Sequence, residues 1–180
     1  MGHISEEELL ILAEKIKLLV LDVDGVLTDG SIILDGGDNE LKSFHVRDGH
    51  GIKMLMSAGI NVAIITGRYS KVVERRAKEL GISEIFQKCH DKTIAYRKLA
   101  DKYSLQDSEI AYVGDDIVDI SVLRMCGFPV AVSDAEDEVK ASVRMITKKG
   151  GGRGAVREVC NFLLKAKGLR EDIIDGHSET

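Results

Sequence analysis

The sequence has three cysteines, no tryptophan and no long apolar run. Cys89, Cys126 and Cys160 lie far apart and form no CxxC pair, so neither a disulfide framework nor a zinc knuckle is indicated. No apolar run approaches the roughly 20 residues that span a bilayer. Residues 1–14 lack the basic region and cleavage site of a signal peptide and carry three consecutive glutamates instead. We therefore expect a cytoplasmic protein that does not act on a membrane.

A surplus of basic residues is also missing. The chain has 25 Lys and Arg against 30 Asp and Glu, a net charge of −5, which argues against a general nucleic-acid-binding surface. An anionic substrate would need a local basic pocket within this acidic chain. The length of 180 residues, with 44% hydrophobic and 31% charged residues, predicts one soluble globular domain over 1–180.

Hydrophobic patterning predicts strands that alternate with helices, and hence parallel βαβ units in a three-layer α/β/α sheet. An alternating segment at 31–46, interrupted by a turn at 35–39, predicts a β-hairpin. A glycine-rich segment at 150–154 and a polar tail at 171–180 are expected to be flexible. We expect helices at about 5–16, 51–58, 70–80, 93–103, 117–125, 136–142 and 155–167, and strands at 18–23, 61–65, 84–86, 110–113, 129–132 and 143–147.

Acidic residues follow the first strand. Strand alternation would place Asp22 and Asp24 on the same side, and clustered carboxylates repel one another unless a cation or proton intervenes. A hard divalent ion such as Mg²⁺ is the natural partner of such oxygen ligands. The alternative is an exposed Asp-Gly turn without a ligand.

Other strand ends carry compatible groups. Thr66-Gly67-Arg68 offers a hydroxyl, an amide and a guanidinium to an anion. The alternative is that Thr66 caps a helix and Arg68 is a solvated charge. Lys92 opens the helix after the next strand and could balance charge on a phosphoryl group. The segment from Gly114 to Asp119 adds three carboxylates, Asp115, Asp116 and Asp119, which favours a metal site over helix-dipole complements.

Taken together and in this order, these motifs resemble the haloacid dehalogenase-like phosphatases. The resemblance implies that Asp22 is the nucleophile that forms an aspartyl phosphate and that Asp24 is the general acid and base. It also implies that Asp22, Asp115 and the backbone carbonyl of Asp24 bind Mg²⁺, with Asp116 and Asp119 in support, and that Thr66 and Lys92 hold the phosphoryl oxygens.

The short intervals between the motifs leave no room for a separate cap domain. The chain therefore resembles the capless branch, and within it the 3-deoxy-D-manno-octulosonate 8-phosphate (KDO 8-phosphate) phosphatases. This resemblance implies a HAD-like, Rossmann-like parallel sheet with a projecting hairpin, and a phosphatase of lipopolysaccharide precursor biosynthesis. The segments that carry it are 22–30 (DVDGVLTDG), 44–53 (FHVRDGHGIK), 66–68 (TGR) and 151–158 (GGRGAVRE).

The family resemblance also supplies a substrate-binding set for a sugar acid with a phosphate at one end and a carboxylate at the other. Arg68 and Arg76, eight residues apart, are expected on one helix face. Surface charge is the alternative for Lys53 and Arg76, and relatives often have arginine in place of Lys53, which puts its bidentate role in question. The set comprises Asp24, His45, Val46, Arg47, Asp48, Gly49, Lys53, Arg68, Arg76 and Lys92.

Several alternatives stay open. The sequence does not separate KDO 8-phosphate from a nine-carbon, sialic-type 9-phosphate as the substrate. A non-catalytic partner domain of a sugar-nucleotide synthetase is a second hypothesis, although the intact motifs oppose it. A receiver module is a third, but its phosphorylated Asp would come later in the chain. Because a capless site is open, we expect a homotetramer in which projecting hairpins pair and each site is completed by a neighbour. The resemblance implies that the glycine-rich segment, with Arg153, is able to reach a neighbouring subunit's site, and a simple loop is the alternative.

Overall fold

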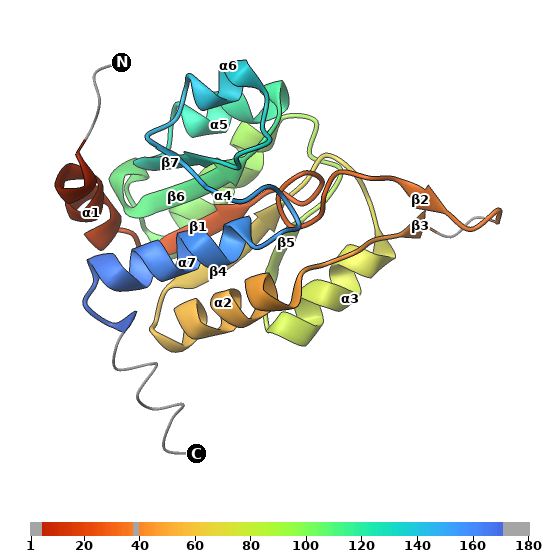
Figure 1. Ribbon diagram of the computed structural model, residues 1–180, viewed down its shortest axis with the longest axis horizontal. Helices are drawn as coiled ribbons and strands as arrows, with labels where there is room; N and C mark the ends of the chain where they lie inside the picture. The colour runs from red at the N-terminus through yellow and green to blue at the C-terminus, as the bar shows by residue number, and fades with distance from the viewer. Residues whose placement is uncertain (1–4, 38–39, 171–180) are drawn as a thin grey trace.

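The computed structural model describes residues 5–37 and 40–170 (Figure 1). Its main sheet has six strands in the order β5-β4-β1-β6-β7-β8, and every pair of neighbouring strands is parallel. This confirms the predicted parallel α/β sheet. The strands are β1 Leu18–Leu21, β4 Asn61–Ile65, β5 Glu84–Phe86, β6 Ile110–Gly114, β7 Phe128–Ala131 and β8 Met145–Ile146.

Helices cover both faces of this sheet and make the three predicted layers (Figure 1). One face carries α2, α3 and α7, with α1 packed against α7, and the other carries α4, α5 and α6. No cap domain is present among the described residues. The helices are α1 Glu6–Glu14, α2 Val46–Ser57, α3 Lys71–Leu80, α4 Lys92–Tyr103, α5 Ile120–Leu123, α6 Asp137–Lys140 and α7 Ala155–Ala166, with short 3-10 helices η1 Asp107–Glu109 and η2 Ile117–Asp119.

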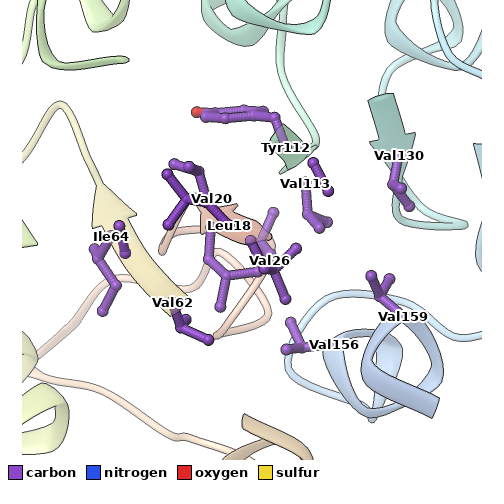
Figure 2. Packing of buried hydrophobic residues seen from close by; sticks show 14 of the residues in the cluster. Leu18, Val20, Val26, Val62, Ile64, Tyr112, Val113, Val130, Val156 and Val159 are labelled. Atoms are coloured by element: carbon purple, nitrogen blue, oxygen red, sulfur yellow. The ribbon is translucent and has the colours of Figure 1, made fainter. Parts of the chain in front are cut away.

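The hydrophobic core lies on both sides of the central strand β1. All four residues of β1 are fully buried, as expected for a parallel strand covered on both faces. Figure 2 shows β1 side chains between those of β4, β6 and α7, including Val62, Val113 and Val156. Each aliphatic side chain buried in this way stabilises the fold by about 1.5–3 kcal/mol. The core therefore holds the carboxyl end of β1 in a fixed place.

Most predicted elements agree with the structure to within two residues, but α2 begins earlier than the predicted residue 51. The predicted start at residue 51 leaves Gly49 outside the helix, and glycine does disfavour helix interiors. Both glycines are instead buried in the helix, where a side chain would collide with its packing partners. A Cβ on Gly51 would lie 2.8 Å from Cδ of Arg157 in α7. Close helix packing thus overrides local propensity.

Two further differences concern the segment after β6 and the hairpin. The helix predicted at 117–125 is divided into η2 and the short α5. The hairpin strands, β2 Ile33–Leu34 and β3 Glu40–Leu41, are shorter than predicted and pair antiparallel, with Ile33 opposite Leu41. They project away from the body of the molecule (Figure 1). The predicted turn includes residues 38 and 39, which lie outside the described residues, as does the tail at 171–180.

Candidate active site

Asp22 is the first residue after β1, at the carboxyl edge of the sheet. Its backbone N–H donates to the carbonyl of Val113, 3.1 Å away, so the pairing with β6 fixes its position. The side chain is buried, and Oδ1 makes no hydrogen bond, although Lys92 Nζ lies 3.0 Å from it. Burial raises the pKa of this carboxyl to about 7, against the opposing effect of Lys92. Asp22 is thus a buried carboxylate that is paired with the Lys92 ammonium.

Two more carboxylates converge on Asp22 from the segment after β6. One oxygen of each of Asp22, Asp115 and Asp119 lies within 4.8 Å of the others. Asp115 Oδ1 is buried without a hydrogen bond, and burial, followed by the charges of Asp22 and Asp119, raises the pKa of Asp115 to about 8. Asp22 and Asp115 therefore lie together at this edge as predicted, with Asp119 as the third member of the group in place of Asp24.

Asp119 differs from the other two because donors already occupy both of its oxygens. Oδ1 accepts hydrogen bonds from Lys92 Nζ at 2.7 Å and from the Tyr112 hydroxyl at 2.6 Å. Oδ2 accepts from the backbone N–H groups of Asp115 and Asp116, at 3.1 and 3.3 Å. Asp119 thus positions the segment of Asp115 and the Lys92 ammonium, and the free ligand atoms belong to Asp22 and Asp115.

Lys92 is the first residue of α4 and lies almost fully buried between two acids. Its ammonium is 3.0 Å from Asp22 and 2.7 Å from Asp119. Burial alone would lower the pKa of Lys92, but these two carboxylates outweigh it, and the pKa lies above its usual value. Lys92 therefore stays a cation at the base of the site.

These groups line a hollow of about 290 Å³ at the carboxyl ends of the strands. Thr66, which follows β4, is buried there, and Arg68 lies at the rim. Asp24 lies in a turn after β1, so the strand alternation used to predict its direction does not apply to it. Its side chain nevertheless lines the same hollow. Sequence reasoning did not assign Cys89 and His90 to the site, since neither belongs to a motif. The lining residues are Asp22, Asp24, Thr66, Gly67, Arg68, Cys89, His90, Lys92, Asp115, Asp116 and Val118.

Backbone packing holds the loop 22–30 against its neighbours. Gly25 has a positive φ of 93°, and a Cβ there would lie 1.9 Å from Oδ2 of Asp115. A Cβ on Gly151 would lie 1.8 Å from the carbonyl oxygen of Gly25, and the Gly152 N–H donates to the carbonyl of Val26 at 3.0 Å. The glycine-rich segment 150–154 thus packs on the loop of its own chain. Its Arg153 pairs with Asp29 at 3.2 Å, and its predicted reach to a neighbouring site stays a prediction.

The predicted sugar-binding residues are not all in the hollow. Four of them, His45, Asp48, Gly49 and Arg76, line a separate cavity of about 10 Å³ between α2 and α3. The Asp48 carboxylate accepts from the backbone N–H of Arg157 at 2.7 Å, at the start of α7. The remaining three, Val46, Arg47 and Lys53, are exposed and line neither cavity.

The prediction that Arg68 and Arg76 share a helix face is wrong. Arg68 precedes α3, which begins at Lys71, so helical spacing does not relate the two. Arg76 lies in α3, with its guanidinium 5.9 Å from the centre of the Phe44 ring. Arg68 lies instead beside the hairpin, with Nη2 2.7 Å from Glu40 Oε1.

The hairpin adds charged groups that sequence reasoning missed. Lys42 forms an ion pair with Asp24 and lies 3.4 Å from Glu40, while Arg68 Nε lies 3.8 Å from the Asp24 carboxylate. The Lys42–Asp24 and Arg68–Glu40 contacts join residues 18 and 28 positions apart, so no local spacing indicates them.

Comparison with known proteins agrees with this geometry. The family model described as haloacid dehalogenase-like hydrolase matches residues 81–158. The 3-deoxy-D-manno-octulosonate 8-phosphate phosphatase of Escherichia coli is 47% identical over 160 residues, which cover 89% of this chain and 85% of that protein. The corresponding enzyme of Yersinia pestis has a crystal structure with a TM-score of 0.90 and 44% identity, over 91% of this chain and 88% of that one.

A third relative carries ligands. The 3-deoxy-D-manno-octulosonate 8-phosphate phosphatase of Moraxella catarrhalis, crystallised with a magnesium ion, a phosphate ion and a KDO molecule, has a TM-score of 0.93. It is 44% identical, over 95% of this chain and 98% of that one. Identity of this extent, spread over nearly the whole of both chains and joined to the same capless sheet, confirms the resemblance seen in the motifs. The chain belongs to the 3-deoxy-D-manno-octulosonate 8-phosphate phosphatase family of haloacid dehalogenase-like hydrolases.

Proposed function

We propose that this chain hydrolyses KDO 8-phosphate to KDO and phosphate through an aspartyl-phosphate intermediate. The observation that carries the proposal is the Asp22 carboxylate, which lies buried in the hollow beside the Lys92 ammonium and the carboxylate of Asp115. A carboxylate held in this way, with Lys92 3.0 Å away, is placed to attack an anionic phosphate. The names of the relatives support the choice of substrate.

The residues present fit a magnesium ion. Asp115 Oδ1 is buried without a hydrogen bond, Asp22 Oδ1 lies beside the single ammonium of Lys92, and hard oxygen ligands are those that Mg²⁺ prefers. We infer that these two carboxylates and the backbone carbonyl of Asp24 hold the ion. When bound, Mg²⁺ supplies positive charge that offsets the repulsion between the phosphate and the carboxylates.

The side chains then divide the chemistry among them. Asp22 attacks phosphorus, and the bond from phosphorus to the sugar oxygen breaks. Asp24 gives a proton to that oxygen and later takes one from the water that hydrolyses the aspartyl phosphate. Thr66 and Lys92 hold the phosphoryl oxygens as their charge changes.

The sugar end of the substrate needs cations and polar groups. Arg68 is half-exposed at the rim of the hollow, where its guanidinium can meet the substrate carboxylate. We retain His45, Val46, Arg47, Asp48, Gly49, Lys53 and Arg76 as the further substrate-binding set. His45 immediately precedes α2, Arg76 lies in α3, and the other five lie in α2.

We also infer where the enzyme acts and what it binds. In the part of the chain that the structure describes, no helix is long and apolar enough to cross a membrane. We infer a cytoplasmic enzyme of small sugar-acid phosphates, and the net charge of −5 supports the absence of a nucleic-acid partner.

The hairpin supports self-association as a homotetramer. Four of its large apolar side chains are exposed, namely Ile32 at 56%, Ile33 at 46%, Leu34 at 67% and Leu41 at 52%. A two-stranded hairpin is marginal alone, and exposed strand edges favour pairing with another chain. Paired hairpins from several copies would cover these side chains and narrow the open site.

A phosphate-release assay tests the function. Purified protein with Mg²⁺ should hydrolyse KDO 8-phosphate faster than a nine-carbon sugar-acid 9-phosphate, and excess chelator should abolish the activity. Asp22→Asn should lower kcat by at least about 10,000-fold because it removes the attacking charge. Asp101→Asn, an exposed position in α4, is the matched control. Retained activity in Asp22→Asn would exclude the aspartyl-phosphate mechanism.

A further inference from the structure

Lys42 follows β3, yet its side chain is only 1% exposed. Its ammonium forms an ion pair with the carboxylate of Asp24, which is 23% exposed, and lies 3.4 Å from Glu40 Oε1. Arg68 joins the same group through contacts of 2.7 Å to Glu40 and 3.8 Å to Asp24. Four charged side chains thus connect the hairpin to the loop 22–30 and to Arg68.

In this hairpin a lysine is buried while apolar side chains are exposed, which is the reverse of the usual pattern. Leu34 and Leu41 are more than half exposed, whereas the lysine, normally the exposed residue type, points inward. Burial of an ammonium is costly unless it is paired with anions. Lys42 has two carboxylates within reach, so its position is determined by Asp24 and Glu40.

These contacts separate Lys42 from the groups that bind substrate. Lys42 does not line the hollow, and its ammonium is already engaged by two acids. Arg68, 48% exposed, is the cation of this cluster that faces the hollow. The direct contact of Lys42 with a proposed catalytic side chain is its ion pair with Asp24.

We propose that Lys42 is a positioning residue that holds the carboxylate of Asp24 where it exchanges protons with the reacting oxygens. This inference rests on the proposed function. As the bond from phosphorus to the sugar oxygen breaks, that oxygen keeps the electron pair and takes the proton of Asp24. Water then attacks phosphorus, loses a proton to Asp24, and the bond to Asp22 breaks. Both transfers need the same carboxylate in the same place.

This role predicts a dependence on the leaving group. A sugar alkoxide is a poor leaving group and needs the proton from Asp24, whereas p-nitrophenolate leaves as a stable anion without it. Loss of Lys42 should therefore slow the first chemical step for the sugar phosphate and spare that step for p-nitrophenyl phosphate. Loss of a merely structural contact would slow both.

The experiment is a single-turnover measurement with magnesium-saturated enzyme in excess over substrate. Lys42→Met should slow the release of KDO from KDO 8-phosphate by roughly 10- to 100-fold, and that of p-nitrophenolate by less than about 3-fold. Lys42→Arg, which keeps a cation, should recover part of the rate. Lys165→Met, which removes an exposed ion pair of 2.7 Å to Glu6, is the control and should leave both rates unchanged.

A double-mutant cycle keeps the test decisive if Lys42→Met is poorly folded. In an Asp24→Asn background, Lys42→Met should add less than about 3-fold to the loss, because the residue acts through Asp24. Equal slowing of both substrates, or full additivity in the cycle, would overturn the positioning role. A wild-type protein that releases neither product would overturn the proposed function, and this inference with it.

Discussion

The buried carboxyl group of Asp22 and the partly buried one of Asp115 lie close together at the edge of the sheet. Burial is the largest cause of the raised pKa at both, which reaches about 7 for Asp22 and about 8 for Asp115. A folded-state pKa above the ordinary value of 3.8 means that the folded chain binds protons more tightly than the unfolded chain. Without a cation, these groups therefore destabilise the fold progressively as the pH rises from about 4 to about 8.

We predict that the metal-free protein has a higher Tm at pH 5.5 than at pH 8. Carboxyls with a lowered pKa, such as Glu40, are fully ionised across this window and do not alter the trend. Mg²⁺ should raise Tm more at pH 8, where it offsets the paired charges. Calorimetry with chelator and with Mg²⁺ measures both effects, with Asp22→Asn expected to reduce the pH dependence. A flat Tm in chelator would contradict the prediction.

Sequence reasoning identified most of the residues around the buried acids. Asp22, Thr66, Lys92 and Asp115 each follow a strand, and parallel strands bring their carboxyl ends to one edge. Sequence reasoning did not find Lys42. The alternating pattern around Lys42 predicts a hairpin but does not indicate which residues the lysine contacts. Local patterns thus predict the site residues at the ends of the sheet strands. They do not predict a site residue that comes from the projecting hairpin.

Among the secondary-structure elements, the buried strands were predicted best and the helix ends least well. The apolar run of β1 predicts a buried strand on its own, whereas the start of α2 depends on tertiary contacts of Gly49 and Gly51. The segment 150–154 is a second such case. Its composition suggested a flexible loop, and in the structure its backbone lies against the loop that carries Asp22.

We predict that Gly151→Ala lowers kcat although residue 151 does not line the hollow. The new Cβ would meet the carbonyl oxygens of Gly25 at 1.8 Å and Thr28 at 2.8 Å, so one of the two segments must move. A displacement of the loop 22–30 by about 1 Å should lower kcat by roughly 10- to 100-fold. Far-UV circular dichroism should show an unchanged fold.

The matched control is Gly59→Ala. Gly59 has a positive φ of 81° but open space around it, so its substitution strains the backbone without a collision. It should lower Tm and leave kcat unchanged. Equal kcat values for both variants and the wild type would show that segment 150–154 does not set the loop geometry.

For the molecule as a whole, the predicted tetramer depends on the apolar hairpin. Leu34→Asp places a charge on a side chain that is 67% exposed in the single chain and would be covered in the assembly. Light scattering at micromolar concentration should give about four times the chain mass of 19.7 kDa for the wild type and a lower mass for the variant. Ile11→Asp, at a 54% exposed position on α1, should stay tetrameric. A wild-type monomer with full activity would contradict this prediction.

The strand order has a consequence for folding during synthesis on the ribosome. β1 lies between β4 and β6, with Leu18 opposite both Asn61 and Ile110, so its two edges are completed by segments that are translated much later. Such non-local pairing raises the contact order and slows folding. Asp22 leaves the exit tunnel early, but its backbone partner Val113 and the acid Asp115 follow only with β6. The nascent chain must therefore keep an apolar central strand unpaired, a natural substrate for chaperones, until the residues that complete its active site have emerged.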